Sequence, residues 1–155
     1  MTTTISRLSF LAVALMLLGA SCSTSIGLGA DDAFFSIDGE DGQPMATASS
    51  VFDLNDTVSY TVPRVGAFTP NAEGEYRAEM ALTVREGGPS GDIVFQNEAL
   101  SGGNGLLLPG EAATHLTACW NPGVEAEVGT YYMHVRIYDL YSNSHLTSGE
   151  TFELR

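Results

Sequence analysis

The chain has 155 residues, of which 19 are Asp or Glu and six are Lys or Arg, so its formal net charge at pH 7 is -13. A chain of this length forms one domain and does not accommodate a two-domain enzyme. The negative charge disfavours direct binding to nucleic acid or to an anionic membrane surface. Apolar residues make up 44% of the chain, enough for a hydrophobic core, so intrinsic disorder is not predicted.

The N-terminal segment has the order of a secretory signal peptide. Arg7 supplies a positive charge, residues 8–18 are apolar and uncharged, and three small residues come directly before Cys22. The apolar run is too short to cross a bilayer as a permanent helix. We therefore predict that residues 1–21 are a signal peptide.

The residues before Cys22 resemble the lipobox at which bacterial lipoproteins are cleaved and acylated. The match departs at Gly19, where a branched apolar residue is usual. The resemblance implies a lipid on Cys22, anchoring in the cell envelope, and no disulfide partner for Cys119. The alternative is ordinary signal-peptidase cleavage near Ser21 or after Ala30, which gives a soluble secreted or periplasmic protein. A retained, unmodified Cys22 could then pair with Cys119.

Cleavage would make the charge more one-sided. Loss of Arg7 would leave five arginines against 19 acidic residues, a net charge of -14, and the chain has no lysine. Lysine is common in average proteins, so its absence is a marked deviation. Two explanations stay open, which are adaptation to high salt, where ions screen dense negative charge, and the composition of a GC-rich genome.

Alternation of apolar and polar side chains predicts β-strands along the rest of the chain. In chain order, the predicted strands are 33–37, 58–62, 76–84, 92–97, 112–119, 131–138 and 151–154. Turn-forming Gly, Asn, Asp and Pro residues lie between them, and no stretch has a sustained helical period. Seven short strands of this kind are typical of an antiparallel β-sandwich. We predict one all-β domain at residues 33–155, preceded by a short tether at residues 22–32.

Residues 127–133 read Glu-Val-Gly-Thr-Tyr-Tyr-Met, which is similar to the acid-x-Gly-x-Tyr-x-Cys pattern of the tyrosine corner in immunoglobulin-like domains. Met133 stands where that pattern has cysteine, so the core there would rest on packing of a thioether. Residues 135–139, followed by a turn and residues 151–154, resemble the closing F–G hairpin of many bacterial extracellular sandwiches of this type. The resemblance implies a single antiparallel immunoglobulin-like β-sandwich of about seven strands, with strand 76–84 lying beside strand 131–138.

Those two neighbouring strands would share one outward face. We predict that it binds a protein partner in the cell envelope through Arg77, Arg85, Tyr132, His134, Arg136 and Tyr138. Arg and Tyr are enriched at the centres of protein interfaces, and three of the five remaining cations would lie on this face. The alternative is plain cross-strand pairing of these arginines with Glu79 and neighbouring carboxylates.

Sequence patterns of catalysis are missing. The chain has no Gly-rich phosphate loop followed by lysine and no Gly-x-Ser-x-Gly motif. His115 and Cys119 would lie about 13 Å apart along one strand, too far for a catalytic dyad. We therefore predict a non-catalytic module without a cofactor.

The alternative function is a calcium- or carbohydrate-binding accessory module. Asp38, Glu40 and Asp41 lie at a glycine turn and offer the hard oxygen ligands that calcium prefers, although they do not follow the EF-hand order. A solvated turn is the simpler interpretation of this acidic segment, which spans residues 31–41. Trp120 precedes a turn and could stack on a sugar ring, but a lone Trp at a strand end more often closes the core.

Overall fold

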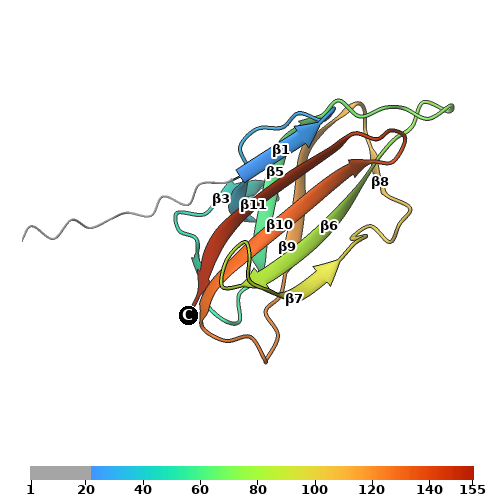
Figure 1. Cartoon of the computed structure of the whole chain (residues 1–155). Helices are drawn as coiled ribbons and strands as arrows, with labels where there is room; N and C mark the ends of the chain where they lie inside the picture. Colours follow the sequence, from blue (N-terminus) through green and yellow to red (C-terminus); the bar gives the residue numbers. More distant parts are fainter. Residues whose placement is uncertain (1–21) are drawn as a thin grey trace, which may run out of the picture.

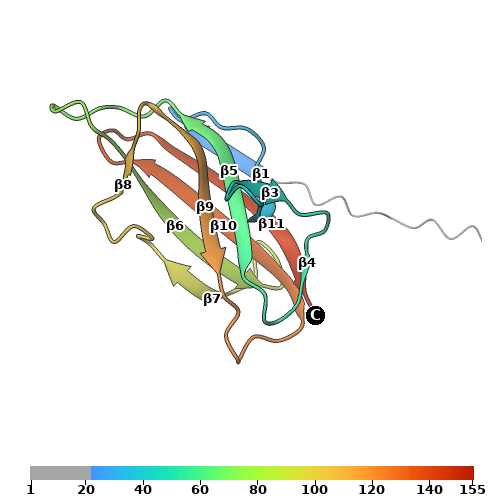
Figure 2. The same ribbon diagram turned by 180° about the vertical axis from the view of Figure 1, so that it is seen from behind.

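The computed structural model describes residues 22–155, and the predicted signal peptide lies outside the described residues. This part of the chain contains eleven strands and no helix. The strands form two sheets that face each other (Figures 1 and 2). The predicted all-β antiparallel sandwich is thereby confirmed. The strand number exceeds seven because several edge strands are only two to five residues long and carry little alternation.

The larger sheet, which we call sheet A, has the strand order β1-β11-β10-β6-β7, with β4 beside β11 and β8 beside β6. Its strands are β1 (Cys22–Ile26), β4 (Val51–Phe52), β6 (Tyr76–Glu86), β7 (Asp92–Asn97), β8 (Leu106–Leu108), β10 (Gly129–Asp139) and β11 (His145–Leu154). All neighbours are antiparallel except the short β4–β11 pair, which is parallel.

The smaller sheet, sheet B, is antiparallel and has the order β3-β2-β5-β9. Its strands are β2 (Phe34–Asp38), β3 (Pro44–Ala46), β5 (Val58–Gly66) and β9 (Ala112–Trp120). Figure 1 looks onto the outward face of sheet A, and Figure 2 shows sheet B in front.

Strands β6 and β10 form the centre of sheet A and show why the alternating pattern produces a sandwich. Every second residue points between the sheets and is buried, namely Met80, Leu82, Val84, Met133, Val135 and Ile137. The register places Val84 opposite Met133 and Leu82 opposite Val135, so the apolar sides of the two strands coincide. Met133 is fully buried, and its flexible thioether packs in the core between the sheets.

The predicted tyrosine corner is confirmed by its hydrogen bonds. The Tyr131 hydroxyl donates to the Glu127 carbonyl oxygen at 2.9 Å and accepts from the Glu127 backbone N–H at 3.2 Å. Burial raises the pKa of this hydroxyl, and the bond to the Glu127 backbone partly offsets the effect. The loop between β9 and β10 is therefore tied to the start of β10.

Aromatic rings join the two sheets in the core. The Phe152 ring of β11 lies 5.4 Å from the Phe35 ring of β2 and 6.0 Å from the Trp120 ring of β9, measured between centroids. Across the same gap, the Tyr60 hydroxyl of β5 is hydrogen-bonded to Ser148 of β11 at 2.9 Å. Burial raises the pKa of Tyr60 to about 12, so the Tyr60 hydroxyl in this inter-sheet hydrogen bond stays protonated at neutral pH.

The structure differs from the sequence interpretation at residues 22–32, which do not form a tether. Strand β1 pairs with β11 in a five-residue register that runs from Cys22 opposite Gly149 to Ile26 opposite His145. Leu28 follows and is buried in the core. The strand was missed because it is mostly polar and lies at a sheet edge, so no apolar alternation marks it. The domain therefore includes this segment.

Candidate functional site

The predicted binding face is the outward side of sheet A over β6 and β10 (Figure 1). Five of the six predicted residues come together there: Arg85, Tyr132, His134, Arg136 and Tyr138. The register places Tyr132 opposite Arg85 and Arg136 opposite Ala81. Their proximity follows from antiparallel pairing of the two strands, which puts outward positions of both strands on the same side.

The outward side chains of β10 contact one another along the strand. The Tyr132 and His134 rings are stacked, with centroids 6.3 Å apart and an angle of 20° between their planes. Arg136 donates from Nη1 to the Tyr138 hydroxyl at 3.0 Å, and its guanidinium carbon lies 5.8 Å from the Tyr138 ring centroid. These contacts hold the row in place and reduce the side-chain entropy that docking would otherwise cost.

Arg77, the sixth predicted residue, lies apart from this row. It precedes the last β6–β10 pair, in which Ala78 is opposite Asp139. Its guanidinium forms an ion pair with Glu75 at 3.5 Å and donates to the Asn104 carbonyl oxygen at 3.2 Å. Arg77 therefore holds neighbouring loops and does not join the other five side chains.

Glu79 is also placed differently from the sequence interpretation, which offered it as a cross-strand partner for the arginines. Its side chain is buried, and its carboxylate accepts hydrogen bonds from the backbone N–H groups of Met80, Ser101 and Gly103 at 2.7–2.9 Å. Burial alone would raise the pKa of Glu79, but these donors outweigh it and hold the pKa below its usual value. The Glu79 carboxylate is thus hydrogen-bonded to backbone N–H groups, and it forms no ion pair with Arg85 or Arg136.

The arginines of the described part of the chain fall into two groups. Three form ion pairs within residues 22–155: Arg64 with Asp31, Arg77 with Glu75, and Arg155 with Asp53. Arg85 and Arg136 form no ion pair there; Arg85 donates to the Gly91 carbonyl oxygen at 2.9 Å, and Arg136 donates to Tyr138. Both unpaired arginines lie on the outward face of sheet A.

A hollow of about 260 Å³ lies between these arginines, and we call it the β6 trough. It is lined by Ala81, Thr83, Arg85, Ile93, Gln96, Glu98, His134 and Arg136. Ala81 and Thr83 of β6 are small, whereas the residues beside them on β7 and β10 are larger, so the middle strand forms a depressed floor. Burial lowers the pKa of His134, and the positive charges of Arg136 and Arg85 lower it further. Burial and the two arginines thus favour the neutral imidazole over the charged one.

The structure does not gather the predicted calcium ligands into a metal site. Within residues 22–155, no three His, Cys, Asp or Glu side chains come close enough to hold a metal ion. Asp38 ends β2, and Glu40 and Asp41 lie in the turn that follows. The Asp41 carboxylate accepts a hydrogen bond from the Gln43 N–H at 3.0 Å, so it stabilises the turn.

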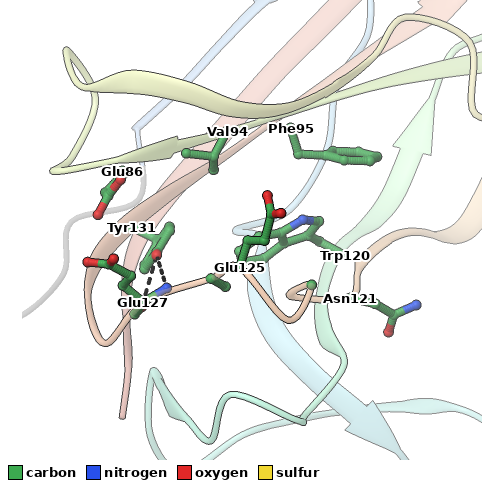
Figure 3. Close-up of a pocket in the computed structure, with 10 residues that line it drawn as sticks. Glu86, Val94, Phe95, Trp120, Asn121, Glu125, Glu127 and Tyr131 are labelled. Atoms are coloured by element: carbon green, nitrogen blue, oxygen red, sulfur yellow. Dashed lines mark hydrogen bonds between the residues drawn. The ribbon is translucent and has the colours of Figure 1, made fainter.

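A larger cavity of about 620 Å³, which we call the end pocket, lies between β7 and the β9–β10 loop (Figure 3). Its lining combines apolar and aromatic residues with three carboxylates: Val94, Phe95, Trp120 and Tyr131 with Glu86, Glu125 and Glu127. Trp120 is only 6% exposed, so most of its indole packs in the core and an edge reaches the pocket. Trp120 was the lining residue that the sequence offered as a ligand-binding group. Segment 120–131 supplies most of the lining, whereas Glu86, Val94 and Phe95 come from β6 and β7, and only the folded structure places them beside it.

No protein-family model matches this chain, and no curated protein matches it. Among solved structures, it is similar to the crystal structure of the C-terminal domain of wzt, with a TM-score of 0.53 and 9% sequence identity. The match covers 90% of this chain and 79% of that chain. At this identity the similarity shows the fold, which is a β-sandwich. Within residues 22–155, no helix is long and apolar enough to span a membrane.

Proposed function

We propose that the protein is a non-catalytic binding module whose outward β6–β10 face docks a protein partner. The proposal rests on Arg85 and Arg136, the two arginines that form no ion pair within the described chain. The chain has 19 carboxylates, so intramolecular partners for these guanidinium groups are abundant. Two arginines left without them, beside ordered aromatic side chains, are typical of an interface centre.

The location of the module is part of this proposal. Export by the predicted signal peptide and a lipid on Cys22 would place the protein in the cell envelope; cleavage without acylation would leave it soluble. Strand β1 begins at Cys22, so an acyl chain on that residue would hold sheet A at the membrane without a spacer. The partner would then be a protein that reaches the same surface.

Reversing one charge on the face tests the proposal. We expect Arg136→Glu to weaken binding to a partner isolated by cross-linking from envelope extracts by at least about tenfold, because it replaces attraction by repulsion. Tyr138→Ala removes the ring that orders Arg136 and should weaken binding less. Affinities would be measured by surface plasmon resonance with each purified variant.

The matched control is Arg155→Glu, an exposed arginine that pairs with Asp53 away from this face. It should leave partner affinity unchanged. Retained fold would be checked by circular dichroism and urea unfolding. Unaltered affinity in well-folded Arg136→Glu and Tyr138→Ala proteins would exclude the face as the docking site.

The second candidate function is binding of a neutral sugar in the end pocket. The specific observation is that Trp120 and Phe95 line one cavity together with Glu86, Glu125 and Glu127 (Figure 3). Aromatic rings can stack on a sugar ring while carboxylates accept hydrogen bonds from its hydroxyl groups.

Calorimetric titration separates this candidate from the first. We expect saturable heat with neutral hexose oligosaccharides, weakened about fivefold or more by Glu125→Gln through loss of a charged acceptor. Glu98→Gln, outside the pocket, is the control. Calcium is titrated in parallel, since it was the other ligand of the sequence-based alternative. Flat titrations with every sugar would exclude the sugar site.

A further inference from the structure

The β6 trough has two positive ends. Arg136 lies opposite Ala81, whereas Arg85 lies four residues further along β6. At about 3.3 Å per residue, these two positions are about 13 Å apart along the strand. Thr83 lies midway between them on the floor. The two arginine side chains therefore begin at well-separated backbone positions. Arg85 is hydrogen-bonded to Gly91 and Arg136 to Tyr138, beyond opposite ends of this interval, so a single small anion is poorly placed to bind both guanidinium groups.

The remaining lining describes what lies between the charges. His134 and Gln96 offer polar groups to a main chain, and Ile93, which is 47% exposed, offers an apolar wall. Glu98 lines the same hollow and would repel a doubly charged group such as phosphate more strongly than a single carboxylate. The lining thus favours a ligand with spaced single negative charges and hydrogen-bonding groups between them.

We infer that the β6 trough binds an extended acidic segment of a partner protein, with one carboxylate on Arg85 and another on Arg136. In an extended chain, side chains four positions apart point to the same side and lie about 13 Å apart, which matches the spacing, along the strand direction, of the register positions of the two arginines. Each guanidinium can bind a carboxylate in a bidentate manner. This inference rests on the proposed function and adds the chemistry of the partner.

The test uses capped nine-residue peptides with Glu at their third and seventh positions and Ser, Thr or Val elsewhere. Isothermal titration of the purified protein at low ionic strength should show binding. Gln in place of either peptide Glu, and Arg85→Gln or Arg136→Gln in the protein, should each weaken binding about tenfold. Arg155→Gln is the matched control and should have no effect.

A double-mutant cycle tests the assignment of pairs. One peptide Glu should show coupling with Arg136→Gln and little with Arg85→Gln, and the other Glu should show the reverse. A peptide with its two Glu residues adjacent should bind about tenfold more weakly, because it cannot reach both arginines. Loss of affinity in 0.5 M NaCl is expected, since exposed charges are screened.

Several outcomes would overturn the inference. These are no binding of the spaced peptide, equal binding of the adjacent-Glu peptide, preferential binding of oligouronate or inorganic phosphate, or self-association of the protein through this face. If the native partner is lost in Arg136→Glu while no peptide binds, the acidic-segment inference fails and the proposed function stands. If the native partner is retained in that variant, the proposed function fails.

Discussion

Replacing Phe152 by alanine is expected to lower the free energy of unfolding by about 4 kcal/mol. The ring is 1% exposed and lies between the sheets. It contacts Phe35 and Trp120 of sheet B and the Tyr131 ring of sheet A, the last at 5.7 Å between centroids. Its removal leaves a cavity in contact with both sheets, which surrounding rings cannot fill without shifting strands.

Urea unfolding followed by Trp120 fluorescence would measure this effect, because the indole packs against Phe152. Phe152→Leu retains much of the volume and should cost under about 1.5 kcal/mol. A loss below about 1 kcal/mol for the alanine variant would contradict the view that this ring cluster joins the sheets.

Replacing Glu79 by alanine is expected to lower the free energy of unfolding by about 3 kcal/mol. The substitution leaves the N–H groups of Met80, Ser101 and Gly103 without the carboxylate that accepts from all three. Hydrogen bonds to a charged group contribute more than neutral ones, and the buried Met80 N–H keeps its desolvation cost when the acceptor is lost. The loop between β7 and β8 should loosen first, because two of the three donors lie in it.

Because the Glu79 carboxylate titrates, its contribution to the free energy of unfolding should depend on pH. Because the pKa of Glu79 is lower in the folded state, its contribution is complete above the ordinary glutamate pKa and is lost as pH falls through the lowered value. The stability difference between the wild type and Glu79→Gln should therefore narrow in acid. Chemical unfolding at pH 7 and below pH 4 would measure it, with the exposed Glu98→Gln as control. A constant difference would contradict this role.

The central strands could be predicted because their burial follows a simple rule. Segments 76–84 and 131–138 alternate over nearly their whole length, and the structure confirms both as β6 and β10. The F–G hairpin was predicted with its last strand at 151–154, but β11 begins at His145. The earlier half was missed because Ser148 and Gly149 are not apolar, although both are buried. Ser148 is hydrogen-bonded to Tyr60, and Gly149 lies against the Tyr132 side chain, so no apolar alternation marks this part of the strand.

The candidate site was partly predictable for the same reason. Outward positions on two neighbouring strands follow from alternation, so Arg85, His134 and Arg136 came out together. Arg77 and Glu79 obey the same alternation but are bound by loop backbone at Asn104 and at residues 101–103. Periodicity says nothing about loops that return over a strand, so these two positions required the folded structure.

Local patterns were enough for the sandwich class, the tyrosine corner and the row of β10 side chains, because each depends on the two-residue repeat of a strand or on a short motif. Docking of residues 22–28, the depth of the β6 trough, the end pocket and the absence of ion pairs at Arg85 and Arg136 came from contacts between distant segments. Those contacts depend on strand order and loop paths, which the free energy of the whole fold selects and no single stretch of residues encodes.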